Sequence, residues 1–290
     1  MADKPKNIAA SVRQRLKNLS RERRRDFGFL LVNYGLERLI YRLSISPYRD
    51  RFILKGGMLV TLWAINDNRT TRDADFLGFG ELDDEKLKAS FADIMAIDGE
   101  DGLVFDTANL TVAAIREDQI YGGARLKTVA LLENARIPIT IDVGLGDAVT
   151  DPDYTINYPS LLSEPIANIR AYPPESVIAE KFQAIVMLGV ANGRMKDYYD
   201  LWALPGVLSI EPASLDAAIA ATFARRETAI PAVAPPGLTA AFSDTLQKAE
   251  QWQTYAESIG LEAVSLAQVT SEIWAYLGPV CERLNAAKRQ

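Results

Sequence analysis

The chain has 290 residues, of which 48% are hydrophobic and 24% are charged, the composition of a globular protein large enough for one large domain or two ordinary ones. It contains one cysteine, Cys281, so an internal disulfide is excluded. It contains no histidine, which excludes Ser-His-Asp and Cys-His catalysis and histidine-bound zinc. Any chemistry must therefore use carboxylates, lysine, arginine, hydroxyl groups and hard metal ions.

The sequence predicts a cytoplasmic protein with no membrane partner. No apolar run approaches the ~18–20 residues that span a bilayer, and the N-terminal MADKPKNIAA lacks the apolar core of a signal peptide. A single cysteine is typical of a reducing compartment.

Charge is distributed unevenly along the chain. Residues 1–50 carry 12 Lys and Arg against 5 Asp and Glu, an excess of seven positive charges on a chain whose net charge is −6. The remaining residues therefore carry a net −13. A basic N-terminal arm on an acidic body can meet phosphate backbones, and the alternative is a solvated helix face.

The first part of the chain reads as helices followed by a strand–turn–helix unit. Helical spacing of apolar residues predicts helices over 7–19, 21–45 and, after a strand that contains Asp73 and Asp75, near 83–96. Between them, the run 52–54 reads as a strand, Lys55-Gly56-Gly57 as a tight turn, and MLVTLWAIN as a further helix.

Strands and helices then separate along the sequence. β-Branched residues and alternation predict strands over 110–117, 124–132 and 137–146. Helices dominate from about 174, and a proline-rich connector at 230–242 precedes helices near 243–258 and 265–285.

This segregation predicts an α+β fold, with a small mixed β-sheet core flanked by helices and a helical C-terminal half. We expect N-terminal helices over 1–50 packed on a core over 51–172, and a helical domain over 173–290. Residues 206–290 contain no motif that indicates a role.

Asp73 and Asp75 lie in an otherwise apolar strand, in the stretch NRTTRDADFLGFG. Residues two apart on a strand share a face, so these carboxylates would repel each other unless a cation lies between them. Mg²⁺ binds such hard oxygen ligands together with substrate phosphates. The alternative is a solvated surface turn, although the apolar flank Phe76-Leu77 favours burial.

Asp142 occupies the polar face of IPITIDVGLG, opposite the isoleucines of that strand. If this strand lies beside the one with Asp73 and Asp75, three carboxylates converge and could hold two metal ions. The alternative is an acid at a strand edge, facing water.

Two further features could bind phosphate. Gly56 and Gly57 lie between a strand and a helix, where glycine permits close approach to a phosphate, although an ordinary tight turn has the same pattern. Lys181 lies within the apolar stripe of its helix and must either extend to water or reach a negative partner.

The stretch NGRMKDYYDLW follows Lys181 and carries Arg194, Asp197 and Asp200. The two acids are three residues apart on the predicted helix and therefore neighbours. An exposed ion-pair ladder is the alternative interpretation of these charges.

The stretches that carry a family resemblance, taken together and in this order, are LKGGMLVTLW, RTTRDADFLG, IPITIDVG and AEKFQAIV, followed by RMKDYYDLW. The chain resembles the AbiEii/AbiGii-type nucleotidyltransferase toxins, which are relatives of the MenT toxins in the polymerase-β-like superfamily. The resemblance extends over about residues 50–205, and the N-terminal helices are similar as well. Met58 departs from the pattern, because the superfamily often has Ser or Thr after the glycines.

The resemblance implies a role for each matching residue. Asp73, Asp75 and Asp142 would be catalytic metal ligands for Mg²⁺ or Mn²⁺, with Lys181 and Asp197 as the other catalytic residues. The nucleotide-binding residues would be Lys55, Gly56, Gly57, Thr71, Lys181, Arg194 and Asp200.

The implied function is a metal-dependent nucleotidyltransferase toxin that transfers NMP from an NTP to an acceptor hydroxyl, that of a tRNA 3′ end or another RNA, and that a cognate antitoxin restrains. The basic stretch 13–25, with Arg21, Arg23, Arg24 and Arg25, is where we expect the RNA backbone. Two alternatives stay open: a nucleotidyltransferase of small molecules such as antibiotics, and a catalytically silent nucleotide- or partner-binding module, which Met58 would favour.

Overall fold

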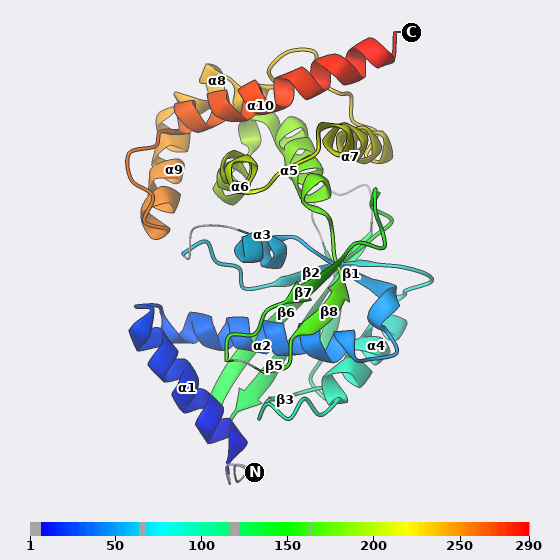
Figure 1. Cartoon of the computed structure of the whole chain (residues 1–290), viewed down its shortest axis with the longest axis vertical. Coiled ribbons are helices and arrows are strands. Elements are labelled where there is room, and N and C mark those ends of the chain that lie inside the picture. Colours follow the sequence, from blue (N-terminus) through cyan, green and yellow to red (C-terminus); the bar gives the residue numbers. More distant parts are fainter. Residues whose placement is uncertain (1–6, 64–67, 116–121, 163, 290) are drawn as a thin grey trace. The chain divides into compact units, whose positions relative to one another are not determined.

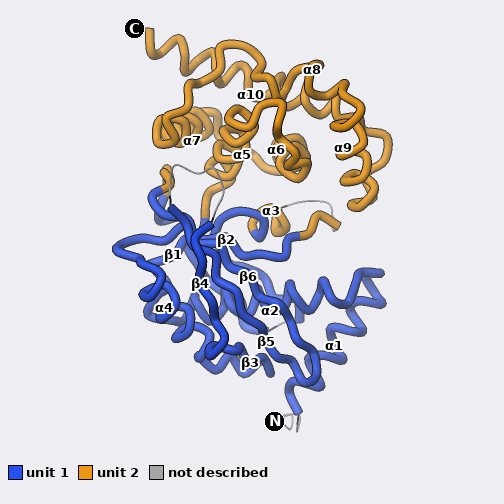
Figure 2. Tube along the Cα trace, turned by 180° about the vertical axis from the view of Figure 1, so that it is seen from behind, with its two compact units in different colours: residues 1–58, 71–146, 152–171 blue, residues 59–70, 147–151, 172–290 orange. Residues whose placement is uncertain are grey.

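The computed structural model describes residues 7–63, 68–115, 122–162 and 164–289. The chain forms two compact units (Figure 2). Unit 1 comprises residues 1–58, 71–146 and 152–171, and unit 2 comprises residues 59–70, 147–151 and 172–290. The chain passes from unit 1 into unit 2 within helix α3 (Gly57–Trp63).

Unit 1 is built on a mixed sheet. Its strands are β1 (Phe52–Lys55), β2 (Ala74–Gly78), β3 (Val104–Phe105), β4 (Thr111–Ala114), β5 (Gly123–Leu132) and β6 (Ala135–Leu145). The spatial order is β1-β2-β6-β5-β3, with β4 also paired to β5. β2 and β6 run parallel, whereas the other neighbours are antiparallel. A hairpin of β7 (Thr155–Tyr158) and β8 (Ala167–Arg170) completes the unit.

Helices cover one face of this sheet (Figure 1). They are α1 (Ile8–Glu22), α2 (Phe27–Ser44) and α4 (Asp84–Ala96). Helix α2 approaches β6 so closely at Gly35 that a Cβ there would lie 2.8 Å from Ile139 Cδ1. Helix α4 places Phe91 5.0 Å from the Phe52 ring and 6.1 Å from the Phe76 ring, between ring centroids. The apolar residues of the central strands therefore face the helices, and the polar residues face away from them.

Unit 2 is helical among the residues that the structure describes. Its helices after α3 are α5 (Pro174–Leu188), α6 (Met195–Val207), α7 (Pro212–Arg225), α8 (Ala240–Ser243), α9 (Leu246–Ser258) and α10 (Leu266–Ala287). Phe182 of α5 packs on Phe223 of α7, with ring centroids 5.3 Å apart, and α10 packs against α6 and α7 (Figure 1). Over the described ranges, no helix combines the length and apolar character needed to cross a bilayer.

The structure confirms the α+β fold with its small mixed sheet, flanking helices and helical C-terminal half. The predicted helix over 21–45 is wrong at its start, because Arg24 has a φ of +52° and α2 begins at Phe27, with Asp26 as N-cap. Strands β3, β7 and β8, which are two to four residues long, were not predicted from the sequence. Parts of two predicted elements, 64–66 and 116–117, lie outside the described residues, and the division at residues 50 and 172 stays a prediction.

A buried ion-pair cluster ties α2 to the loop before β3. Asp101 accepts hydrogen bonds from Arg42 Nη1 and Nη2 at 2.6 and 2.9 Å and from Arg38 Nε at 3.1 Å. All three side chains are buried. Removing one partner of such a cluster leaves an uncompensated charge in the core, which costs far more than the loss of an exposed ion pair.

We therefore expect Asp101→Ala to lower the free energy of unfolding by about 3–5 kcal/mol. Asp153→Ala, which removes an acid with a 91% exposed side chain that pairs with Arg170 at 3.4 Å, should cost less than about 1 kcal/mol. Urea denaturation followed by circular dichroism measures both, and equal losses for the two variants would contradict the assignment of Asp101 as the centre of this cluster.

Candidate active site

Three carboxylates converge on the polar face of the sheet in unit 1. Asp75 lies on β2, Asp73 immediately precedes that strand, and Asp142 lies on the parallel neighbour β6, in register with Asp75. One carboxylate oxygen from each residue lies within 4.8 Å of the others. The sequence interpretation that these acids meet is therefore correct in its geometry, and we call them the acidic triad.

Two basic residues extend this arrangement across four neighbouring strands. In the strand register, Lys55 of β1 is opposite Asp75, Asp75 is opposite Asp142, and Asp142 is opposite Arg125 of β5. Residues opposite each other on neighbouring strands point to the same face. Lys55, Asp75, Asp142 and Arg125 thus form what we call the charge row, in which two central acids lie between two flanking cations.

The acidic triad is held from the β1–α3 turn and from the segment before β2. Gly57 N donates to Asp75 Oδ2 at 3.2 Å, and Thr71 Oγ1 donates to Asp73 Oδ1. Gly56 has a φ of +68°, and a Cβ there would lie 2.0 Å from Asp75 Oδ2, whereas one on Gly57 would lie 2.6 Å from Thr71 Oγ1. Both glycines are therefore required by the side chains that pack against them.

Burial and mutual repulsion perturb the carboxylate at the centre of the triad. Desolvation, followed by the charge on Asp73, raises the pKa of Asp75 from 3.8 to about 6, and Lys55 and the Gly57 N–H oppose the shift only in part. Burial, more than the neighbouring charges, therefore favours the neutral form of this carboxyl.

Met58 contributes to the core rather than to the triad. Its side chain is fully buried, with Sδ 4.0 Å from the Tyr158 hydroxyl oxygen. The hydroxyl nearest the triad is that of Thr71 instead, which sequence analysis proposed as a phosphate contact and which here orients Asp73.

A second charged cluster, the Lys181 cluster, forms within unit 2. Lys181 Nζ on α5 lies 2.5 Å from Asp197 Oδ1 and 2.9 Å from Asp200 Oδ2, both on α6. Arg69 binds Asp200 through Nε at 2.8 Å and Nη2 at 2.7 Å, and Arg194 Nε lies 2.8 Å from Asp197 Oδ2. Three cations and two acids give this cluster a net charge of +1.

Asp197 is 3% and Asp200 0% exposed, which overturns the exposed ion-pair ladder for these two acids, whereas the Arg194 side chain is 55% exposed. Burial by itself would lower the pKa of Lys181, but Asp197 and Asp200 raise it, so the ammonium stays charged. Burial would likewise raise the pKa of Asp200, but Lys181 and Arg69 lower it. Lys181 and Asp200 are therefore both ionised at neutral pH.

Sequence analysis missed two residues, Arg69 and Arg125. Arg125 binds both oxygens of Asp142, with Nε to Oδ1 and Nη2 to Oδ2 each at 2.7 Å. Arg69 is the first residue of the motif RTTRDADFLG and Arg125 lies in no motif, and in both cases only strand register or tertiary packing reveals the partner. The signal for Arg125 that the sequence offers is its alternation with apolar residues in ARLKTVALL.

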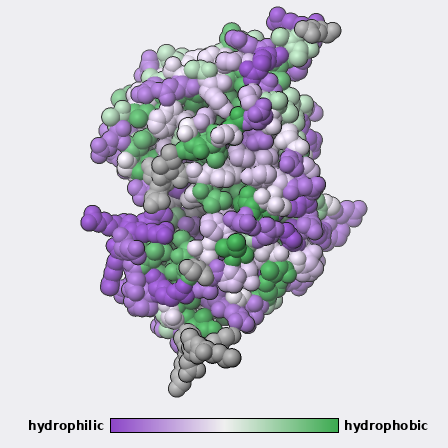
Figure 3. All heavy atoms as spheres, in the orientation of Figure 1, coloured by the Kyte–Doolittle hydropathy of each residue, from purple (hydrophilic) through white to green (hydrophobic). Residues whose placement is uncertain are grey.

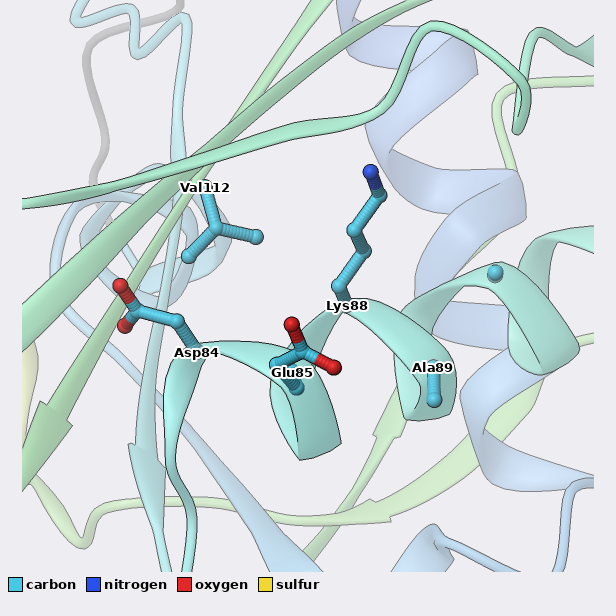
Figure 4. Close-up of a pocket in the computed structure, with 6 residues that line it drawn as sticks. Asp84, Glu85, Lys88, Ala89 and Val112 are labelled. Atoms are coloured by element: carbon cyan, nitrogen blue, oxygen red, sulfur yellow. The ribbon is translucent and has the colours of Figure 1, made fainter.

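The predicted site residues thus fall into two groups. Unit 1 contains Lys55, Gly56, Gly57, Thr71, Asp73, Asp75 and Asp142, and unit 2 contains Lys181, Arg194, Asp197 and Asp200. A separate open pocket on the surface of unit 1 is lined by residues of α4 and by Val112 of β4, and its lining includes none of the predicted site residues (Figure 4).

The raised pKa of Asp75 predicts a pH-dependent stability in the absence of divalent cations. Because the folded pKa exceeds the unfolded one, folding favours the protonated carboxyl, and this stabilisation is complete below pH about 4 and lost as the pH rises through about 6. The asparagine side chain in Asp75→Asn cannot ionise. The unfolding free energy of this variant, relative to that of the wild type, should therefore increase by about 2 kcal/mol between pH 4 and 6.5. Urea denaturation in EDTA measures this; a constant difference, or an equal trend in Asp153→Asn, would contradict it.

The tight fit around Gly56 predicts that it tolerates no side chain. Gly56→Ala combines a left-handed backbone with a Cβ inside the Asp75 carboxylate, and we expect a loss of at least about 1–2 kcal/mol in unfolding free energy. Gly122→Ala is the matched control, since among the described residues other than its chain neighbours no atom lies within 4 Å of a Cβ there, and it should change stability by less than about 0.5 kcal/mol. Thermal and urea unfolding distinguish the two, and a wild-type stability of Gly56→Ala would be the contradicting result.

The fold and the geometry of the two clusters can be compared with known proteins. Among solved structures, a Helicobacter pylori protein described as a nucleotidyltransferase superposes with a TM-score of 0.51 at 14% identity, over 89% of this chain and 97% of that one. The JHP933 protein of Helicobacter pylori gives a TM-score of 0.46 at 13% identity, over 89% and 95% of the two chains. No curated protein matches the sequence. At 14% identity the first likeness concerns the fold alone.

The sequence profile described as "Nucleotidyl transferase AbiEii toxin, Type IV TA system" matches residues 38–276, which is most of the chain. The matched range contains the acidic triad, the charge row and the Lys181 cluster. The chain therefore belongs to the AbiEii family of nucleotidyltransferase toxins of type IV toxin–antitoxin systems.

Proposed function

We propose that this nucleotidyltransferase is metal-dependent and transfers a nucleoside monophosphate from an NTP to a hydroxyl group of RNA, the 3′ end of a tRNA. The observation that carries this proposal is the convergence of Asp73, Asp75 and Asp142 within 4.8 Å on one face of the sheet. Three acids in such proximity, one of them with a raised pKa, make a site that a hard divalent cation would stabilise.

The residues of the triad fit such an ion. Each offers a carboxylate oxygen, the ligand type that Mg²⁺ and Mn²⁺ prefer, and none of the three is a histidine or a cysteine, which would suit a softer metal. A divalent cation held by Asp73, Asp75 and Asp142 would supply Lewis-acid stabilisation for the charge on the α-phosphate.

The chain's own residues have separate roles in the proposed transfer. The acceptor oxygen forms a bond to the α-phosphorus, the bond from that phosphorus to the β-bridging oxygen breaks, and pyrophosphate leaves. We assign removal of the acceptor's proton to Asp142. Thr71 fixes the Asp73 carboxylate, and the turn at Gly56 and Gly57 fixes that of Asp75.

The Lys181 cluster has the charge required for a phosphate-binding role. Its net charge is +1, and its cations already lie in fixed positions because Asp197 and Asp200 hold them. Preorganised cations stabilise developing phosphate charge without the cost of reorganisation. We propose that Lys181 and Arg194 offset the charge of the nucleotide phosphates, and that Asp197 and Asp200 orient these cations.

RNA rather than a small acceptor is favoured by a basic surface on unit 1. Lys17, Arg21, Arg23 and Arg24 are exposed at the end of α1 and the turn that follows it. Hydrophilic side chains gather over this region, where α1 ends and α2 begins (Figure 3). Arg13 and Arg15, earlier on α1, pair with Glu133 and Glu164. The charge that remains for a phosphate backbone is therefore concentrated at the turn.

Membership of a type IV toxin–antitoxin family implies an antitoxin partner and a nucleotide substrate. We propose that the antitoxin limits the transfer reaction described above.

The basic turn makes the RNA acceptor testable through ionic strength, since RNA binding weakens steeply with salt and binding of a small neutral acceptor does not.

The test is transfer of label from each α-³²P-labelled NTP in turn to total tRNA, in the presence of Mg²⁺. We expect label on tRNA with at least one NTP, and a loss of about 100-fold or more in rate for Asp73→Ala. Asp84→Ala, which removes an exposed acid at the start of α4 outside the triad, should keep the wild-type rate. Transfer by Asp73→Ala at the wild-type rate would reject the triad as the catalytic centre. Label on a small acceptor but never on RNA would reject the RNA acceptor.

A further inference from the structure

Arg125 forms an ion pair with Asp142, which supplies the third carboxylate of the acidic triad. Nε and Nη2 of Arg125 each lie 2.7 Å from a different oxygen of Asp142, so the guanidinium engages both oxygens at once. The Arg125 side chain is 38% exposed, whereas that of Asp142 is 15% exposed. The pair is therefore reachable from solvent on the arginine side and enclosed on the carboxylate side.

This pair differs in its charge from the hydrogen bonds that Thr71 and Gly57 donate to the triad. Thr71 and the Gly57 N–H are neutral donors that orient Asp73 and Asp75 without changing the charge of the site. Arg125 adds a permanent positive charge, because a guanidinium does not lose its proton in proteins. Together with Lys55 at the other end of the charge row, it reduces the net charge of triad and row to −1.

Resting on the proposed metal-dependent function, we infer that Arg125 is a positioning residue that competes with the divalent cation for Asp142. A doubly charged cation on the triad would repel the guanidinium that is bound to one of its ligands. Mg²⁺ also demands nearly ideal octahedral geometry, which a carboxylate held by a bidentate arginine cannot freely adopt. Arg125 therefore releases Asp142 when the cation binds, and it keeps the three carboxylates together when the site holds no cation.

The arrangement also explains how three acids persist so close together in a folded chain. Asp142 and Asp75 are opposite each other on neighbouring strands, where like charges destabilise a sheet. Arg125 neutralises one of them from the next strand, at the register position opposite Asp142. The fold therefore needs Arg125 as a counter-ion when no metal ion is bound, and this need is why Arg125 competes with the cation for Asp142.

The first test is direct binding of Mn²⁺ by electron paramagnetic resonance or titration calorimetry. We expect Arg125→Gln to bind Mn²⁺ at least about tenfold more tightly than wild type, because one competing charge is removed. Arg125→Lys, which keeps the charge, should stay within about threefold. Lys127→Gln is the matched control: Lys127 lies two residues along β5 and opposite Thr140 rather than an acid, and its removal should change affinity by less than about twofold.

The second test measures the wild-type chain and uses a variant only to assign one resonance. In ¹⁵N-labelled protein, the Nε–H resonance absent from Arg125→Lys is assigned to Arg125. We expect saturating Mg²⁺ to shift it and to accelerate its exchange with water, as the bond to Asp142 is lost. An unchanged resonance at saturation would overturn the inference.

The outcomes separate this inference from the proposed function on which it rests. Binding of Mn²⁺ that is unchanged or weaker in Arg125→Gln would overturn the competition while leaving the metal site in place, since Arg125 would then only orient Asp142. If neither the wild type nor any of the variants binds Mn²⁺, with or without NTP, the metal site itself is overturned and the inference with it.

Discussion

Repulsion between Asp75 and Asp142, in register on two adjacent parallel strands, is the constraint on which the rest of the site depends. Two acids side by side in a half-buried position destabilise a sheet unless positive charge lies close to them. The fold places Lys55 on β1 and Arg125 on β5, the strands that flank β2 and β6, so that the charge row runs from cation to cation through both acids. Asp73, added from the end of the strand, restores the excess of negative charge.

The local structure around the triad follows from this constraint. The β1–α3 turn has two glycines because the Asp75 carboxylate leaves no volume for a Cβ at Gly56 and the Thr71 hydroxyl leaves none at Gly57. A second acid just before β2 needs a donor within its own segment, which Thr71 provides. The opposite face of the same strands is apolar and packs against α2 and α4, which keeps the strands in the register that the charges require.

The Lys181 cluster of unit 2 has the opposite balance of charge to the triad and charge row. Its cations outnumber its acids, and in each ion pair the acid is the more deeply buried partner. Asp200 is fully buried and held by both Lys181 and Arg69, so its charge is compensated on two sides. A buried cluster of this kind contributes little net stability, since desolvation offsets most of the attraction. Its value lies in the fixed position of its cations, which is the property that phosphate chemistry uses.

The sequence by itself determined the fold class, the family and the faces of the strands. The absence of histidine, the alternation around Asp142 and the spacing of Asp73 and Asp75 are local properties that the chain carries in any conformation. Only the tertiary structure decided that Asp142 is adjacent to Asp75, that Arg125 engages it, and that Arg69 completes the Lys181 cluster. The reason is physical: pairing of strands 67 residues apart and contacts between helices depend on register and packing, which no pattern within one segment encodes.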